Sequence, residues 1–177
     1  LDGSSGTDTV SYALASAGVK VNLGLATSQK TGFGRDTLRN FENLTGSDFN
    51  DSLRGNGAAN LITGGKGRDA LAGGGGNDTF VYNAATDSGS TSLTWDSILD
   101  FNTGDKIDLS AIDANVTVVG NDVFSTTLVS AASAFTKAGQ LRFSSGVLFG
   151  NTDADAEPEF AIALVGVTSL SSTALVV

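Results

Sequence analysis

The sequence has no cysteine, no histidine and no methionine, and it has a single proline among its 177 residues. Without cysteine, neither disulfides nor thiolate metal sites can form. Without histidine, the chain lacks the commonest general base and a frequent ligand of catalytic zinc. These absences argue against zinc-dependent hydrolysis and against Ser-His-Asp or Cys-His catalysis, so we expect this segment to be non-catalytic.

Positive charge is also scarce, with 10 basic residues against 19 acidic ones and a net charge of −9. Such a chain is a poor partner for nucleic acid and for anionic membranes, but it attracts hard cations. The sequence contains no apolar run long enough to span a membrane and no N-terminal signal peptide. Because the chain starts at Leu1 rather than Met, we expect a C-terminal piece of a longer protein with an upstream domain as partner.

Glycine, by contrast, is abundant, and much of it falls in a nine-residue repeat. Four consecutive blocks read GSDFNDSLR (46–54), GNGAANLIT (55–63), GGKGRDALA (64–72) and GGGGNDTFV (73–81). The sixth position is a carboxylate or an amide in every block: Asp51, Asn60, Asp69 and Asp78. The eighth position is always apolar: Leu53, Ile62, Leu71 and Phe80.

Each block predicts a turn followed by a short strand. Glycine permits positive φ in the turn, and the eighth residue faces a narrow core. Consecutive blocks then alternate between two short parallel sheets, with Leu53 next to Leu71 in one sheet and Ile62 next to Phe80 in the other. The many Thr, Ser and Val residues and the single proline favour the same fold class, an all-β parallel β-roll.

Stacked turns would place the sixth-position carboxylates about 4.8 Å apart, the spacing of neighbouring strands. Like charges repel at this distance, so a cation has to lie between them. Carboxylate and backbone carbonyl oxygens form a hard ligand shell, which suits Ca²⁺ rather than Zn²⁺ or Cu²⁺. The repeat therefore predicts several calcium ions bound in the turns.

The four blocks match GGxGxDxUx, the nonapeptide of RTX calcium-binding β-rolls. Further segments resemble the C-terminal region of serralysin-type secreted metalloproteases and related RTX exoproteins: 8–23, 36–47, 78–88, 95–113 and 138–172. The resemblance implies a protein that leaves the cell through a type I secretion apparatus and works outside the cell or on its surface.

The resemblance also implies where the ions lie, between turns two blocks apart. One turn supplies two backbone carbonyls and the side chain of its sixth residue. The other turn also supplies the side chain of its sixth residue, with two backbone carbonyls from different positions of the block. The first implied site joins Ser47, Phe49 and Asp51 to Gly64, Lys66 and Asp69. The second joins Asn56, Ala58 and Asn60 to Gly73, Gly75 and Asp78, with the neutral Asn60 weakening it.

Further sites extend this series in both directions. Downstream, Gly65, Gly67 and Asp69 would meet Asp87, the next sixth-position residue, and Asp96. Upstream, Gly3, Ser5 and Asp8 would pair with Asn40 and Glu42, which makes 9–39 an inserted excursion. Within that excursion, Val19, Val21, Leu23 and Leu25 alternate as in a half-buried strand. Asp100, Asp105 and Asp108 are expected to be loop and strand-edge carboxylates.

Each of these residues has a simpler interpretation, because aspartate in a glycine-rich turn often caps its own backbone. A phosphate-binding loop is excluded, since GGKGRD lacks the required spacing and its carboxylates would repel phosphate. The stretch 151–160 alternates Asn151, Asp153, Asp155 and Glu157 like a calcium loop. It lacks the central glycine and the closing glutamate of an EF-hand, which favours a solvated hairpin loop.

We expect residues 1–115 to form the β-roll and 116–177 to form a C-terminal antiparallel β region carrying the secretion signal. Within the roll, 88–115 would cap the open end with Trp95, Ile98, Phe101, Ile107, Leu109 and Ile112. Beyond it, strands are expected near 140–144, 147–150, 160–165 and 173–177, with a short helix in 128–139 ending at Gly139. Thr173 or Ala174 stands where related chains have an acidic residue.

The sequence therefore predicts a calcium-binding C-terminal domain of a secreted bacterial protein. It would act as a type I secretion signal and as a module that folds outside the cell when calcium binds. The alternative is a carbohydrate- or surface-binding module of a polysaccharide-modifying enzyme or an adhesin. Basic or aromatic residues along one sheet face would favour that alternative.

Overall fold

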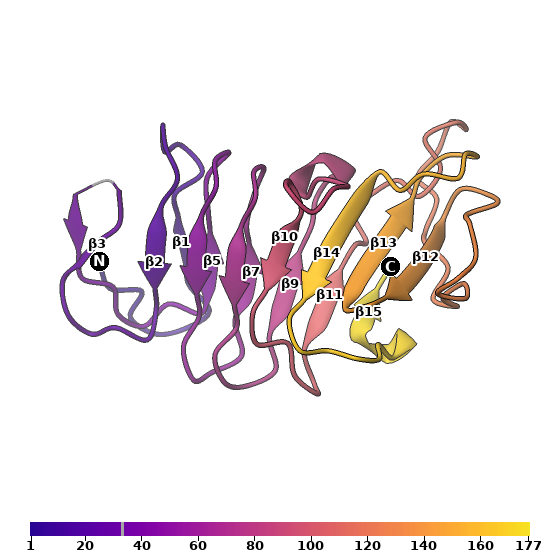
Figure 1. The fold of residues 1–177 in the computed structure, drawn as a ribbon. Coiled ribbons are helices and arrows are strands. Elements are labelled where there is room, and N and C mark those ends of the chain that lie inside the picture. The colour runs from indigo at the N-terminus through magenta and orange to yellow at the C-terminus, as the bar shows by residue number, and fades with distance from the viewer. Residues whose placement is uncertain (33) are drawn as a thin grey trace.

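The computed structural model describes residues 1–32 and 34–177, and its strands stack into two long sheets that face each other (Figure 1). The N-terminus lies near one end of the stack and the C-terminal strands lie at the other. In the central part of each sheet, neighbouring strands are separated in the chain by one strand of the other sheet. This winding confirms the predicted β-roll.

The first sheet is six-stranded and entirely parallel. Its strands, in spatial order, are β1 (Thr9–Ser11), β5 (Asn43–Thr45), β7 (Leu61–Thr63), β9 (Thr79–Val81), β11 (Lys106–Asp108) and β15 (Leu175–Val176). The second sheet is seven-stranded, in the order β12 (Gln140–Ser144), β13 (Val147–Asn151), β14 (Phe160–Leu164), β10 (Asp96–Ile98), β8 (Ala70–Ala72), β6 (Ser52–Arg54) and β2 (Lys20–Asn22).

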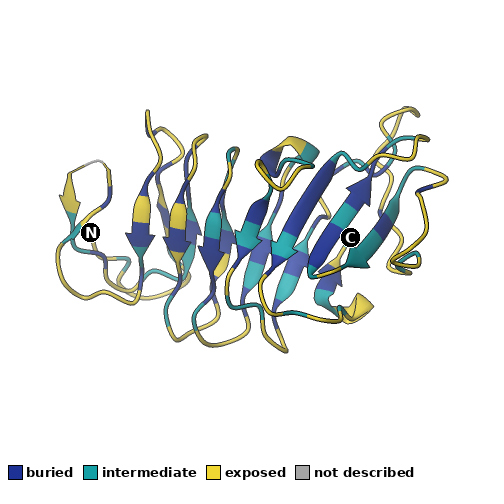
Figure 2. Cartoon of the chain, in the orientation of Figure 1, coloured by how far each residue is buried: buried dark blue, intermediate teal, exposed yellow. Residues whose placement is uncertain are grey.

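The core consists of one column of apolar side chains on the inner face of each sheet. In the first sheet, the register aligns Val10, Leu44, Ile62, Phe80, Ile107 and Leu175. In the second, it aligns Val21, Leu53, Leu71, Ile98 and Leu164. All of these side chains are buried (Figure 2), each contributing about 1.5–3 kcal/mol. The predicted pairs Leu53–Leu71 and Ile62–Phe80 are confirmed.

The segment 9–39 was predicted to be an inserted excursion carrying a half-buried strand, but part of it belongs to the regular winding of the roll. Its strands β1 and β2 pair in parallel with β5 and β6, so they are the first members of the two sheets. The remainder contains a two-stranded hairpin, β3 (Gln29–Lys30) and β4 (Arg35–Asp36). Val19, Val21 and Leu23 are buried as expected, whereas Leu25 is exposed. Strand β1 follows the glycine-containing turn GSSGTD (3–8), whereas β2 has no such turn before it.

The expected cap at 88–115 also proves to be part of the roll. Ile98 and Ile107 continue the two columns, and the sheets run on into β14 and β15. The open end is covered instead by the antiparallel strands β12, β13 and β14. The boundary expected at residue 115 therefore does not coincide with a break in either sheet.

The helix expected in 128–139 is absent from the described residues. Two short 3-10 turns, Ala85–Asp87 and Ser172–Ala174, are the helical elements in the described part of the chain. Residue Val129 instead forms a bridge to Arg142, and its N–H donates to the Leu141 carbonyl at 2.9 Å. Pairing with the sheet thus replaces the local helical preference. Neither 3-10 turn is long and apolar enough to cross a membrane.

Candidate metal centre

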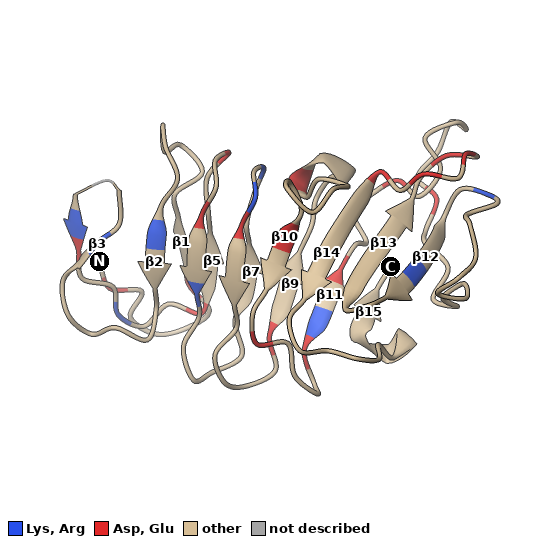
Figure 3. Cartoon of the chain, in the orientation of Figure 1, with Lys and Arg blue, Asp and Glu red and all other residues tan. Residues whose placement is uncertain are grey.

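Two rows of acidic and amide side chains follow the turns along the two edges of the stack, here called the ladders (Figure 3). Every member stands at the start of a strand, two residues before the buried apolar residue. The first ladder contains Asp51, Asp69 and Asp96, next to β6, β8 and β10. The second contains Asp8, Glu42, Asn60, Asp78 and Asp105, next to β1, β5, β7, β9 and β11.

In the first ladder, the backbone N–H groups of Asp51 and Asp69 each donate a hydrogen bond to the carboxylate of the next turn, whereas the Asp96 N–H donates to Ser88 Oγ at 2.9 Å. The Asp51 N–H reaches Asp69 Oδ1 at 2.8 Å, and the Asp69 N–H reaches Asp96 Oδ1 at 2.7 Å. The series begins with the Val19 N–H, which is 2.7 Å from Asp51 Oδ1. One oxygen of each carboxylate is thereby fixed by the backbone of its neighbour.

The second ladder repeats this geometry. Glu42 Oε2 accepts from the Asp8 N–H at 3.0 Å, Asp78 Oδ1 from Asn60 at 2.8 Å, and Asp105 Oδ1 from Asp78 at 2.9 Å. The neutral Asn60 differs from the carboxylates because its Nδ2 donates to the Glu42 carbonyl at 2.9 Å. This step of the ladder therefore carries less negative charge than the others.

The second carboxylate oxygen is left free at several positions. The Oδ2 atoms of Asp8, Asp69 and Asp96 are buried and have no hydrogen-bond partner within the described residues. Burial, followed by the charge of Asp96, raises the pKa of Asp69 to about 8. Burial is also the main reason that the pKa of Asp96 rises to about 7. These carboxylates thus require either a proton or a cation when the roll is folded.

Backbone carbonyls converge on the same points. A Cβ atom at Gly46 would overlap both Asp51 Oδ2 and the Gly64 carbonyl oxygen. At Gly55, a Cβ would likewise overlap Asn60 Oδ1 and the Gly73 carbonyl. A side-chain oxygen of one turn thus meets a carbonyl two blocks later, at a point that only glycine leaves open. Both side-chain oxygens also cap their own turns, since Asp51 Oδ2 accepts from the Ser47 N–H and Asn60 Oδ1 accepts from the Asn56 N–H. The two pairs correspond to positions of the sites implied for the nonapeptides, in an oxygen-rich setting of the kind that calcium prefers.

A family model described as Peptidase M10 serralysin C terminal matches residues 4–177 of the chain. The chain belongs to this family. As a serralysin C-terminal domain it is an RTX-type, calcium-binding β-roll, and the family is the non-catalytic part of its proteins. No match was found among curated protein sequences.

Among solved structures, this serralysin C-terminal domain is similar to the AlgE6R3 subunit of the Azotobacter vinelandii mannuronan C5-epimerase, determined in solution. The two chains are 29% identical, the match covers 76% of each chain, and the TM-score is 0.43.

The remaining backbone positions implied as ligands lie in the turns of the domain. A Cβ at Gly65, whose φ is +95°, would overlap the Ser47 carbonyl, and one at Gly3 would overlap the Asn40 carbonyl. Three other carbonyls lie against glycines of the turn two blocks on: Phe49 against Gly67, Asn56 against Gly74 and Ala58 against Gly76. The Asn56 carbonyl also accepts from the Gly75 N–H at 2.8 Å, whereas Ser5 is exposed.

The position expected for Asp87 needs correction. Asp87 is not the next member of the ladder, because the next strand of the sheet is β10 and its first residue is Asp96, but the charge of Asp87 still acts on Asp69 and helps to raise its pKa. Asp87 lies in a 3-10 turn, where its Oδ2 accepts from the N–H groups of Asn83 and Ala84 at 2.8 and 3.0 Å. It is nevertheless buried, and its charge helps to raise the pKa of Asp96.

One ladder residue, Asp105, and one further carboxylate that binds the turns, Asp100, were missed in the sequence. Asp105, expected to be a strand-edge carboxylate, is 3% exposed and accepts from Asp78 and Asn102. Asp100 accepts from the N–H groups of Gly73 and Gly74, at 2.8 and 3.1 Å. The order Asp105-Lys106-Ile107 repeats the acidic-x-apolar pattern of the blocks, which was the available signal. The nine-residue spacing fails there because the chain is longer between β9, β10 and β11.

Proposed function

We propose that this domain is a calcium-triggered folding module of a secreted protein. The observation that carries the proposal is the buried Oδ2 atom of Asp69, which has no hydrogen-bond partner within the described residues, together with the buried carboxylate of Asp96, beside which lies the buried hydroxyl of Tyr82. Leaving such oxygens unsatisfied costs about 1–3 kcal/mol each, and more when they are charged. A calcium ion between neighbouring turns would satisfy them and cancel the repulsion along the ladder.

Calcium concentration would then control folding. In a calcium-poor cytoplasm, repulsion between the stacked carboxylates keeps the roll unfolded and able to pass through a narrow channel. Outside the cell, calcium exceeds the dissociation constants of about 10⁻⁴–10⁻³ M that are usual for extracellular sites. An ion at a hundred times its dissociation constant stabilises the fold by about 2.7 kcal/mol, so several ions switch a marginal fold.

Circular dichroism during a calcium titration tests this function. The chain should be largely unordered in chelator and should gain β-structure cooperatively as calcium is added. Magnesium should substitute poorly, because it prefers octahedral, partly hydrated sites. Identical spectra in chelator and in calcium would reject the switch.

Export through a type I secretion apparatus completes the proposed function, with the upstream part of the parent protein as cargo. The last strand, β15, lies beside β11 at the end of the first sheet, outside the ladders. Because the export signal is expected in the C-terminal region, truncation after Ser171 should impair secretion from a type I-competent host. Because β15 carries no ladder residue, calcium binding by the ladders should stay nearly intact. Unchanged secretion would place the export signal elsewhere in the chain.

A second candidate function, binding of a carbohydrate, is supported by one group of side chains from β12, β13 and the residue before β10. The Trp95 ring lies 6.2 Å from Phe149, and the Arg142 guanidinium lies 5.0 Å above the Phe149 ring centre. All three side chains are partly exposed. Trp95 is the single tryptophan, so its fluorescence during titration with neutral and anionic oligosaccharides tests this function. No change with either class would reject it.

A further inference from the structure

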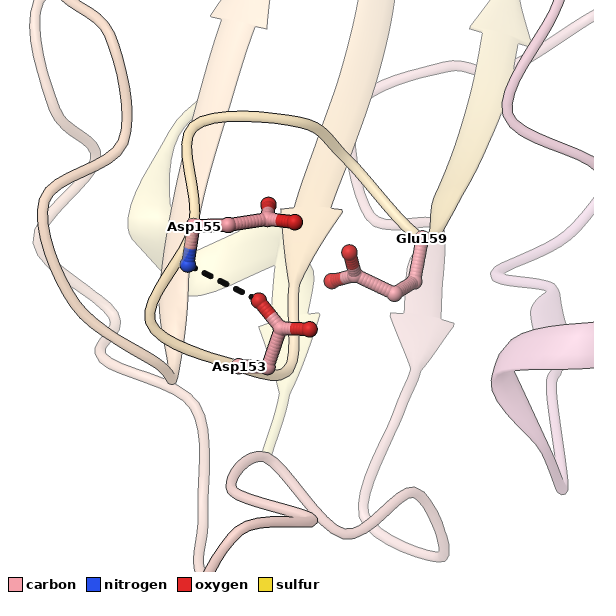
Figure 4. A group of neighbouring side chains, drawn as sticks. All are labelled: Asp153, Asp155 and Glu159. Carbon is pink, nitrogen blue, oxygen red and sulfur yellow. Dashed lines mark hydrogen bonds between the residues drawn. The ribbon is translucent and has the colours of Figure 1, made fainter.

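The loop between β13 and β14 gathers a second acidic group, remote in sequence from the ladders (Figure 4). One carboxylate oxygen from each of Asp153, Asp155 and Glu159 lies within 4.8 Å of the others. The sequence pattern pointed to Glu157 as the fourth alternating residue, but the structure brings Glu159 into the group instead. The sequence favoured a solvated loop because a closing acidic ligand was missing. In the folded chain, Glu159 takes that place.

An independent feature lies directly beneath this loop. Asn151, the last residue of β13, is fully buried. Its Nδ2 donates to the carbonyls of Asp155 and Glu157 at 3.0 and 2.9 Å, so the amide is directed into the loop. Its Oδ1 is buried and has no hydrogen-bond partner within the described residues. Buried polar atoms are nearly always satisfied, so this oxygen is open to an ion or to a water molecule.

The loop backbone already holds one oxygen of each carboxylate. The Asp155 N–H donates to Asp153 Oδ1 at 2.9 Å, and the Thr152 N–H donates to Glu159 Oε2. Asp155 Oδ1 accepts from the Glu157 N–H at 2.8 Å. These bonds orient the three groups and leave the second oxygen of each for another ligand. In the part of the chain that the structure describes, the one salt bridge joins Lys66 to Asp48, so no basic side chain neutralises this group.

We propose that this loop binds one calcium ion through the carboxylates of Asp153, Asp155 and Glu159 and the amide oxygen of Asn151. Three carboxylates and one amide oxygen form an all-oxygen shell, which a few water molecules would complete. The ion would tie the end of β13 to the start of β14. Because β14 pairs with β10 of the roll, the ion would fasten the antiparallel strands at the end of the stack.

The test counts calcium ions per chain by equilibrium dialysis of the complete 177-residue chain. Free calcium is set at about 10 mM, above the usual range of extracellular dissociation constants. The Asp153→Asn/Glu159→Gln variant removes two ligand charges and keeps an acceptor for each loop N–H. Glu157→Gln is the matched control, since it removes a charge from the same loop without removing a ligand.

The double variant should bind one ion fewer than the control, which should bind as many as the unmodified chain. Calcium should also slow hydrogen exchange at the Asp155 and Glu157 amides in the control but not in the double variant. An equal count in both variants, or a loss in both, would overturn the proposal. Should the double variant not fold, Glu159→Gln alone is measured. The loop is separate from the ladders, so the two proposals fail independently. If substitutions in the ladders do not affect folding, the proposed switch is refuted, but the proposed calcium site in this loop is not.

Discussion

In the nonapeptide blocks each strand has three residues and buries one large side chain, whereas β12, β13 and β14 have five residues each. Strand β14 alone buries Phe160, Ile162 and Leu164, and the Phe160 ring packs edge-on against Phe124 at 5.7 Å. The roll is thus thin and its turns bury charge, while the antiparallel end has a thicker apolar core. We infer that the roll depends on ions for stability much more than the antiparallel end does.

Removing calcium should produce the largest difference between the two regions. Chelation leaves the buried carboxylates of the ladders unneutralised, so amides of β5 to β9 should lose nearly all protection from hydrogen exchange. Amides of β12 to β14 should lose less, because their strands bury more apolar surface per residue. Mass spectrometry of exchanged peptides measures both. Equal loss of protection in the two regions would show that they unfold as one unit.

Replacement of Asp69 should be the most damaging single change to calcium binding in the roll. Asp69→Ala removes a carboxylate shared by the turns of Asp51 and Asp96 and leaves the buried Asp51 N–H without its acceptor. We expect the calcium affinity to fall at least about tenfold, or 1.4 kcal/mol, at two sites. The matched control is Arg68→Ala, whose exposed side chain offers no ligand, and its affinity should hold or rise slightly.

Calorimetric titration of the two variants with calcium makes this comparison. Equal affinity and equal ion number in Asp69→Ala and Arg68→Ala would contradict the ladder register.

Two glycine variants test whether the space beside the ladder carboxylates has to stay free of a side chain. A Cβ at Gly64 would overlap Asp69 Oδ2, so Gly64→Ala should raise the calcium concentration needed for folding. Gly57→Ala is the control, since a Cβ there meets nothing within 4 Å. The control should be neutral or stabilising by about 0.4–1 kcal/mol. Circular dichroism at stepped calcium concentrations compares them, and coincident curves would count against the proposed ligand geometry.

The smallest expected effect is that of pH. The pKa of Asp69 is raised to about 8 in the ion-free fold, so this fold holds a proton that the unfolded chain releases near pH 4. The cost of this buried charge is fully present above about pH 8 and disappears as the pH falls toward 4. If the roll is already folded before calcium binds, calcium has to displace this proton, and its affinity should fall about fivefold between about pH 8 and about pH 7. If calcium instead drives folding of the unfolded chain, whose Asp69 is already ionised at neutral pH, the affinity should not change in this range.

Calcium titrations in buffers of different ionisation enthalpy measure the released protons. No proton release near neutral pH would show that Asp69 is already ionised before calcium binds.

The periodic part of the molecule was predictable from the sequence. A nine-residue repeat with an apolar eighth position assigns Leu53, Leu71, Ile62 and Phe80 to two alternating columns, as the structure confirms. Asp105 was missed because it follows a longer segment, which breaks the spacing while the pairing of β9 with β11 continues. The helix expected in 128–139 failed for a related reason, since a bridge to Arg142 outweighs local preference.

The sequence by itself determined the fold class, the alternation of the strands and the side chains of the central turns, because these depend on contacts that repeat every two blocks. Only the tertiary structure decided which residues continue the ladders and where the acidic loop closes. Asp96 and Asp105 reach their neighbours across 27 residues, and Glu159 rather than Glu157 faces Asp153. Such contacts depend on how segments of irregular length fold back onto the stack, and no local pattern records that path.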